Sequence, residues 1–217
     1  DVYFVISRYV EIDGEPYVIE MFKRLHDNSV MDTLERERLV NKLIGYKEKV
    51  YRDVLTEAYN RRYYEDELKE KKINAGVALL DLDDFKHIND GLGHQYGDVL
   101  LKAISHSLQR IEGIEDTCYR MGGDEFVIIL SPAVYEKREQ IITNIKDIFL
   151  KPWFLRDSDY YCTMSMGVVR FPADGDTVEE LIKKADIALY SAKCAGKNRI
   201  EFYDDNVEST SYKRLDL

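Results

Sequence analysis

The sequence has few cysteines and fewer basic than acidic side chains. Its three cysteines, Cys118, Cys162 and Cys194, form no Cys-x-x-Cys pair, which excludes a disulfide framework and a zinc site of that type. The 31 Lys and Arg against 41 Asp and Glu give a net charge of -10, whereas nucleic-acid binding needs basic surface. We therefore expect a protein of the reducing cytoplasm that does not bind nucleic acid.

Long apolar runs are also lacking. No stretch approaches the roughly 20 apolar residues of a membrane span, and no signal peptide is visible. The 217 residues, 45% of them hydrophobic, suffice for one domain and an appendage. Because the chain begins at Asp1 and not at Met, we expect a piece of a longer protein, in which a sensor domain or a membrane anchor lies upstream.

The most informative stretch is residues 120–130, in which two glycines and two acids precede an apolar run. Glycine permits the positive φ angles of a tight hairpin, so Asp124 and Glu125 are expected at a turn. The run Phe126 to Leu130 is short and rich in β-branched residues, which predicts a strand buried on both faces. Carboxylates held beside a dry core require compensation by a cation, a donor or a proton.

A second apolar stretch, residues 76–82, carries Asp81 near its end and is followed by Asp83 and Asp84. If the two strands pair antiparallel, Asp81 approaches Asp124 and Glu125. Oxygen ligands from two strands and a backbone carbonyl suit magnesium, with manganese as a second option. The alternative is that these acids only cap strand ends in solvent.

Upstream of these strands, the sequence predicts a hairpin and a helix. Strands are expected over residues 2–10 and 17–22, with Asp13 and Gly14 at the turn. They resemble the last strands of a PAS-type sensor domain, or form an unrelated hairpin. Residues 29–53 are charged and helical, with an apolar stripe that fits a short coiled coil or a single amphipathic helix, formed by Val40, Leu43, Val50 and Val54.

The remaining periodicity predicts alternating helices and strands. Three glycines, Gly91, Gly93 and Gly97, are expected to form a loop, and Val99 is expected to be buried on the helix that follows. A capping box at Thr177 and Glu180 opens a further helix. The expected helices are 60–72, 85–92, 98–109, 133–150 and one from 177; the other expected strands are 153–156, 160–171 and 199–203. This order indicates a split βαβ arrangement with the first strand between its neighbours.

Several segments together resemble the diguanylate cyclase (GGDEF) family. The signature is Gly122-Gly123-Asp124-Glu125-Phe126, and matches flank it in the family's order over about residues 53–203. They are Asp53-Val54-Leu55-Thr56, Asn60-Arg61-Arg62, the stretch Asp81 to Asp90, Gly93 to Asp98, Ser165-Met166-Gly167-Val168, Ala185 to Tyr190 with Lys193, and Gly196-Lys197-Asn198-Arg199.

The resemblance implies an α/β (α+β), ferredoxin-like or palm-type domain with a five-stranded, mostly antiparallel central sheet. It divides the chain into a hairpin at 1–28, a signalling helix at 29–52, a cyclase domain at 53–203 and a polar tail at 204–217. The implied activity is condensation of two GTP into cyclic di-GMP by a homodimer. The alternatives are an inactive regulator of the same fold that binds GTP or a partner, and a nucleotidyl transferase acting on nucleic acid, which the acidic charge disfavours.

The resemblance also assigns the site residues. Asp81, the Leu82 carbonyl and Asp124 would hold magnesium, and Glu125 would act as base or as a further metal ligand. The triphosphate would be bound by Lys86, Lys193 and Lys197, and the guanine read by Asn89 and Asp98. His94 matches a nucleotide-contacting position, with a purely structural hydrogen bond as the alternative.

Two positions depart from the family pattern. Lys197 stands where the family usually has Arg, which weakens a bidentate grip on phosphate. Many members carry an Arg-x-x-Asp product-inhibition site six residues before the signature. Here Asp116 is present, but Gly113 occupies the position of the arginine, and Arg110 is three residues out of register.

Overall fold

The computed structural model describes residues 2–12, 15–25, 46, 49–170 and 172–204 and divides the chain into two units, 1–48 and 49–217. In the first unit, β1 (Val2–Ile12) pairs antiparallel with β2 (Glu15–Leu25), which confirms the expected hairpin. Its turn at 13–14, most of the expected helix 29–53 and the tail beyond Asp204 lie outside the described residues.

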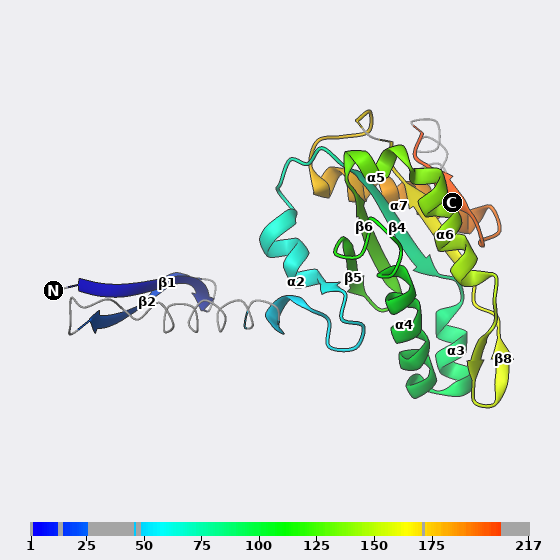
Figure 1. Ribbon diagram of the computed structural model, residues 1–217, viewed down its shortest axis with the longest axis horizontal. Coiled ribbons are helices and arrows are strands. Elements are labelled where there is room, and N and C mark those ends of the chain that lie inside the picture. Colours follow the sequence, from blue (N-terminus) through cyan, green and yellow to red (C-terminus); the bar gives the residue numbers. More distant parts are fainter. Residues whose placement is uncertain (1, 13–14, 26–45, 47–48, 171, 205–217) are drawn as a thin grey trace. The chain divides into compact units, whose positions relative to one another are not determined.

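The second unit is built on a six-stranded sheet in the order β10-β9-β4-β6-β5-β3 (Figure 1). Both neighbours of β4 are antiparallel to it, so the expected central position of the acid-bearing strand is confirmed. The expected count of five strands is wrong, because parallel pairs close both edges of the sheet. The strands are β3 (Tyr59–Asn60), β4 (Gly76–Leu82), β5 (Cys118–Gly122), β6 (Glu125–Leu130), β9 (Met164–Val168) and β10 (Ile200–Phe202).

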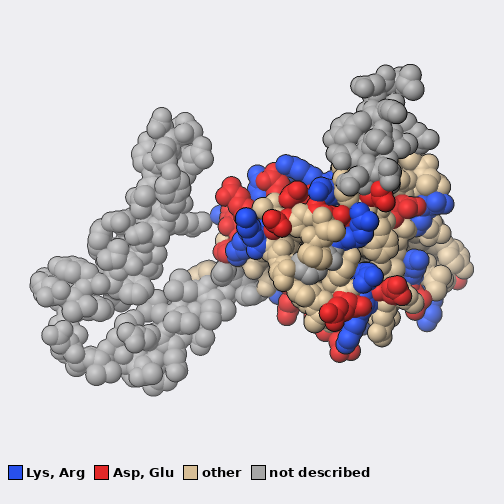
Figure 2. All heavy atoms as spheres, turned by 90° about the horizontal axis from the view of Figure 1, so that it is seen from above, with Lys and Arg blue, Asp and Glu red and all other residues tan. Residues whose placement is uncertain are grey.

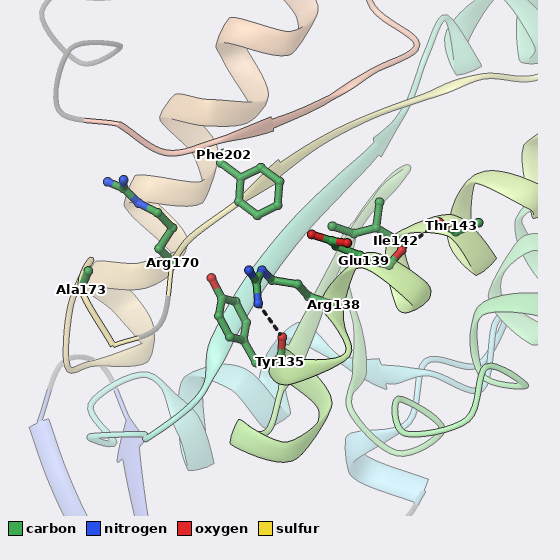
Figure 3. A pocket seen from close by; sticks show the side chains of 8 residues that line it. All are labelled: Tyr135, Arg138, Glu139, Ile142, Thr143, Arg170, Ala173 and Phe202. Carbon is green, nitrogen blue, oxygen red and sulfur yellow. Dashed lines mark hydrogen bonds between the residues drawn. The ribbon is translucent and has the colours of Figure 1, made fainter.

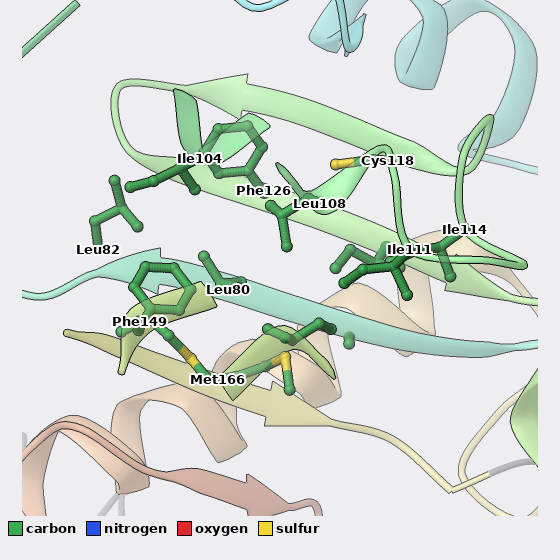
Figure 4. Close-up of a cluster of buried hydrophobic side chains, with 14 of the residues drawn as sticks. Leu80, Leu82, Ile104, Leu108, Ile111, Ile114, Cys118, Phe126, Phe149 and Met166 are labelled. Atoms are coloured by element: carbon green, nitrogen blue, oxygen red, sulfur yellow. The ribbon is translucent and has the colours of Figure 1, made fainter. Parts of the chain in front are cut away.

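Helices cover both faces of this sheet (Figure 1). Ala78, Leu80 and Leu82 of β4 join the larger core, with α4 and α6 (Figure 4), while Val77 and Leu79 face α7. This alternation is the period of two that a strand buried on both faces requires. The helices are α2 (Arg61–Tyr63), the π-helical segment η1 (Tyr64–Leu68), α3 (Phe85–Leu92), α4 (His94–Leu108), α5 (Pro132–Glu136), α6 (Arg138–Phe149) and α7 (Val178–Cys194).

Two expected helices and the expected glycine loop differ in the structure. The expected helix 60–72 is α2 and η1, because Asn60 ends β3 and its side chain accepts the N–H of Tyr63 at 3.1 Å as a cap. The expected loop at the glycines is wrong, since Gly91 lies in α3, Gly97 lies in α4 and only Gly93, at φ +96°, separates them. The expected helix 133–150 is interrupted at Lys137, between α5 and α6.

The expected burial of Val99 is also wrong, because its side chain is 53% exposed on α4. The expected strand 160–171 is wrong in its bounds, because β8 (Ser158–Tyr160) forms a short hairpin with β7 (Trp153–Leu155) around a turn at Arg156 and Asp157, whereas β9 pairs with β4. The helix start expected at Thr177 is confirmed, since Thr177 Oγ1 accepts the Glu180 N–H at 3.3 Å. The capping box is incomplete, because the Glu180 carboxylate accepts the N–H of Asp176, at 3.3 Å, in place of that of Thr177.

Candidate active site

The sheet brings the acids of the two predicted strands together. Asp81, near the end of β4, is in register with Glu125, the first residue of β6, and Asp124 occupies the turn just before it. Gly122 and Gly123, at φ +150° and +51°, make that turn. Both predictions, antiparallel pairing and a glycine turn that carries the acids, are therefore confirmed.

We call Asp81, Asp124 and Glu125 the acidic edge. Their three carboxylates carry more negative charge than the one adjacent lysine, Lys193, compensates. Lys193 Nζ, in the last turn of α7, lies 2.9 Å from Asp81 Oδ1. Burial raises the pKa of Asp124, and the charge of Asp81 raises it further. The charges of Lys193 and Arg120 lower this pKa, but by less. Burial and then Asp81 raise the pKa of Glu125 in the same way. A divalent cation placed among these carboxylates would relieve both the burial cost and the repulsion.

The donor set is compatible with magnesium but does not enclose it. Within the described ranges, no three His, Cys, Asp or Glu side chains are close enough to hold a metal ion. Magnesium in phosphoryl-transfer sites is typically bound by one or two carboxylates, with water and substrate phosphate completing its octahedron. The opposed Asp81 and Glu125, with Asp124 beside them, fit that partial ligand set.

The predicted triphosphate lysines are distributed unequally. Lys193 reaches Asp81, and Lys197 Nζ lies 2.6 Å from Asp84 Oδ1, just after β4. Lys86 is exposed in the first turn of α3, and no hydrogen bond or ion pair among the described residues links it to the acids. The structure thus brings two of the three predicted lysines to the end of β4.

The predicted guanine-reading residues lie on α3 and α4, which pack against each other. Asn89 of α3 is tied to α4 by a close approach, because a Cβ on Gly97 would overlap the Asn89 side-chain oxygen. Asp98 follows Gly97 in sequence and is exposed, as is His94 at the start of α4. The absence of a side chain at Gly97 therefore lets Asn89 lie against α4, beside the residue that precedes Asp98.

Sequence reasoning missed a clamp on the signature turn. Arg120 donates to the Gly123 carbonyl from Nε at 3.1 Å and from Nη2 at 2.8 Å, and its Nη1 donates to Asp53 Oδ1 at 2.8 Å. Asp53 Oδ1 also accepts the backbone N–H of Thr56 at 2.9 Å and its hydroxyl at 2.7 Å. Arg120 therefore links the start of the domain to the peptide group that precedes Asp124. In the sequence, the only sign of this contact is that Arg120 comes shortly before Gly122 and Gly123.

Two further acids near the site, Asp83 and Asp186, were not assigned a role from the sequence. Asp83 is buried beneath the end of β4, where hydroxyl and backbone donors surround it. Asp186 of α7 has a pKa raised by burial, lowered by Lys193 and raised again by Asp81, which places it in the field of the acidic edge. A run of acids in sequence does not distinguish a ligand from a structural carboxylate.

The position of the missing inhibitory arginine has a constrained backbone. Gly113 has φ +96°, and a Cβ there would lie 3.0 Å from Cγ2 of Val134. An arginine at this position would therefore strain the backbone as well as add a charge. Asp116 is exposed, and its Oδ1 lies 3.6 Å from Nη2 of Arg52, a residue distant in sequence.

A separate groove of about 780 Å³ lies away from the acids (Figure 3). The Tyr135 ring at one side of it occupies the space that a Cβ on Gly76 would need, at the opposite end of β4 from Asp81. The groove is lined by Tyr135, Arg138, Glu139, Ile142, Thr143, Arg170, Ala173 and Phe202.

Among the residues described, no helix is long and apolar enough to cross a membrane.

Comparison with known proteins agrees with this geometry. Residues 50–199 match the family model of the diguanylate cyclase GGDEF domain. The bifunctional diguanylate cyclase/cyclic di-GMP phosphodiesterase MucR of Pseudomonas aeruginosa is 30% identical over 172 residues, 76% of this chain and 25% of MucR. The diguanylate cyclase VdcA of Vibrio cholerae is 35% identical over 176 residues, 77% of this chain and 51% of VdcA.

A solved GGDEF domain of TpbB (YfiN) from Pseudomonas aeruginosa superposes with a TM-score of 0.65 at 30% identity, covering 74% of this chain and 99% of that one. The chain thus spans only about a quarter of MucR and half of VdcA, so these proteins contain much that has no counterpart here. The matched region nevertheless includes the whole acidic edge and the two lysines at the end of β4, Lys193 and Lys197. The chain belongs to the GGDEF diguanylate cyclase domain family.

Proposed function

We propose that this chain is a diguanylate cyclase that condenses two GTP into cyclic di-GMP and releases two pyrophosphates. The observation that carries the proposal is the register of Asp81 against Glu125, with Asp124 beside them, in a chain of the cyclase family. Phosphoryl transfer depends on positioning and charge neutralisation more than on a reactive side chain. An acidic edge with two adjacent lysines supplies the residues for both tasks.

In this proposal the acids hold magnesium, or manganese, at the triphosphate. Asp81, the Leu82 carbonyl and Asp124 are the ligands, with Glu125 as a further ligand or as the base. The bound metal would neutralise phosphate charge and favour ionisation of the attacking hydroxyl. Glu125 pairs with Asp81 in the sheet, which places it beside the proposed metal ligands in either role.

The substrate is placed by the lysines and the two helices. Lys193 and Lys197 bind the triphosphate from the α7 side and Lys86 from α3. Asn89 and Asp98 read the guanine, with His94 beside them. A carboxylate accepts the N1 and N2 hydrogens of guanine, whereas adenine offers no matching donor pair and leaves the acid unpaired.

The product requires two subunits. Each protomer holds one GTP, and the 3′-hydroxyl of each attacks the α-phosphate of the other. A new P–O bond forms, the bond to pyrophosphate breaks, and Glu125 or a metal-bound base takes the hydroxyl proton. One copy presents one nucleotide, so the proposed active form is a homodimer that an upstream sensor brings together in the cytoplasm.

A second candidate is a regulator of the same fold that binds GTP without converting it. MucR is named for both synthesis and hydrolysis of cyclic di-GMP, so family membership alone does not fix the activity of this chain. A nucleic-acid substrate is disfavoured by the net charge of -10, and Figure 2 shows acidic and basic side chains interspersed on the face it presents.

The deciding experiment incubates the purified chain with GTP and magnesium and identifies the product by chromatography and mass spectrometry. Asp124→Asn tests the acidic edge. The matched control is Asp174→Asn, because Asp174 is a buried acid, 4% exposed, in the loop after β9 and away from the acids. Cyclic di-GMP from the wild type and Asp174→Asn but not from Asp124→Asn supports the cyclase. Bound but unconverted GTP supports the regulator.

A further inference from the structure

Asp83 is a buried carboxylate held by three donors from two distant segments. Its side chain is 6% exposed, just beyond β4. Oδ2 accepts the Thr163 hydroxyl at 2.7 Å, and Oδ1 accepts the Ser165 hydroxyl at 2.7 Å. Oδ2 also accepts the backbone N–H of Asn198 at 2.9 Å. A buried carboxylate with this many hydrogen bonds is a fixed point of the structure, since losing a donor would leave its charge uncompensated.

The segment on the far side of this contact has an unfavourable backbone. Gly196, Lys197 and Asn198 have φ angles of +112°, +61° and +48°, so three consecutive residues are left-handed. Residues other than glycine rarely adopt that conformation, and it persists only when the surroundings enforce it. The Asn198 N–H bonded to Asp83 supplies such a constraint directly.

The constrained segment places the Lys197 ammonium group beside Asp84, just after β4. It follows α7, which carries Lys193, and it contains Lys197, whose Nζ lies 2.6 Å from Asp84 Oδ1. On its other side the Arg199 carbonyl accepts the Met166 N–H of β9 at 2.9 Å. Asp83 thus holds the backbone of the segment while Asp84 holds its ammonium group.

We propose that Asp83 is a positioning residue, which fixes the left-handed segment 196–198 so that Lys197 is presented to the anionic part of the substrate. Asp83 itself contacts neither substrate nor metal. The role toward substrate rests on the proposed function, in which that substrate is GTP. The constraint that Asp83 places on segment 196–198 does not depend on the proposed function.

The contact predicts different outcomes for two substitutions. Asp83→Ala removes all three acceptor interactions. Asp83→Asn keeps an oxygen for the Asn198 N–H, and its amide nitrogen can donate to the Ser165 hydroxyl, which is able to reverse its role. The conservative variant should therefore behave like the wild type.

The first measurement is hydrogen exchange in the nucleotide-free protein, read on peptides that contain Asn198. Asp83→Ala should speed exchange there by about ten- to a hundredfold, the equivalent of one lost charge-assisted hydrogen bond. The matched control is Asp174→Ala, because the buried Asp174 carboxylate likewise accepts a loop N–H, that of Arg170, at the opposite end of β4. It should leave Asn198 exchange unchanged. Equal exchange in Asp83→Ala and the wild type overturns the proposal.

The second measurement separates substrate binding from turnover. Asp83→Ala should raise KM for GTP by about tenfold or more and change kcat less, with Asp83→Asn near the wild type. Thr163→Val, which removes one hydroxyl without changing the shape, should shift KM in the same direction by less and serves if Asp83→Ala does not fold. An unchanged KM in a variant with fast Asn198 exchange overturns the positioning role. A wild type that does not bind GTP overturns the proposed function while the exchange result still decides the hold on the segment.

Discussion

Removing the Arg120 guanidinium should destabilise the domain, because its hydrogen bonds to two separate segments are lost together. It donates to the Gly123 carbonyl in the signature turn and to Asp53 at the start of the domain. The side chains of Arg120 and Asp53 are 13% and 25% exposed, so little solvent is available to replace the partner that is lost. Loss of one member therefore leaves the other charge poorly solvated.

The magnitude follows from that burial. A hydrogen bond to a charged group contributes about 1.5 to 3 kcal/mol. Arg120→Ala, or Asp53→Ala, should therefore lower the free energy of unfolding by about 2 to 4 kcal/mol, the larger value applying if the remaining charge stays buried. The double mutant should lose less than the sum, with a coupling of about 1.5 to 3 kcal/mol.

The pH dependence of this contribution has a defined sign. Burial by itself raises the pKa of Asp53, but the hydrogen bonds from Thr56 and Arg120 outweigh it, so the pKa is lowered from 3.8. A lowered folded-state pKa gives stability that is present above pH 3.8 and is lost as pH falls through the folded-state value. The coupling should therefore be constant near neutral pH and diminish only in acid.

Urea unfolding followed by circular dichroism, with the fluorescence of the single tryptophan Trp153 as a second probe, measures each variant. The matched control is the cycle on Arg61 and Glu65, an ion pair of the same 2.8 Å separation whose side chains are 68% and 50% exposed. Solvent screens such a pair, so its coupling should be much smaller. A coupling between Asp53 and Arg120 no larger than that of the control would refute the reasoning from burial.

Three further predictions concern the proposed site. In Asp124→Asn, the melting temperature without metal should rise, because an acid with a raised pKa destabilises the fold above its ordinary pKa. The stabilisation of the wild type by magnesium, about 2.7 kcal/mol at a hundredfold excess over Kd, should vanish in this variant. Differential scanning calorimetry measures both effects, and undiminished stabilisation by magnesium contradicts the metal assignment. Gly97→Ala should displace Asn89 and raise KM for GTP by about tenfold. Asp98→Ala should reduce the preference for GTP over ATP by about 1 to 3 kcal/mol. Competition kinetics measure both, and wild-type constants in these variants would show that the guanine contacts lie elsewhere. Cyclic di-GMP should bind the inhibitory surface about ten- to a hundredfold more weakly than in relatives that carry its arginine, because Gly113 offers no guanidinium, and tight binding in calorimetry would contradict this.

The sequence predicted the acidic edge because its determinants are local. Two short apolar runs specify β4 and β6, and the glycines before Asp124 specify the turn. Antiparallel pairing of those strands then leaves little freedom in where Asp81 and Glu125 meet. Another local signal, the capping residue Thr177, predicted the start of α7.

The features that the sequence did not predict depend on tertiary contacts. Gly97 lies inside α4 at a point where a larger residue would overlap Asn89 of α3, and no local pattern reveals that contact. The edge strand β3 is two residues long, below the length at which alternation is detectable, and stacks Tyr59 on Tyr119 with ring centroids 5.4 Å apart. Asp83 was indistinguishable in sequence from the neighbouring acids, because its burial is set by donors some 80 residues away.

The position of β4 in the sheet also sets when the site can form during folding. Its two partners, β6 and β9, follow it far along the chain, and Leu82 is paired with Met164. Closing such long loops costs entropy before any pairing is gained, and folds dominated by non-local pairing fold slowly. During synthesis Asp81 of β4 therefore lacks Glu125 until β6 has been made, and it lacks its other partner in the sheet, Ser165, until β9 has been made. A chain truncated before residue 164 would contain every acid of the proposed site and still lack the strand that completes the sheet around them.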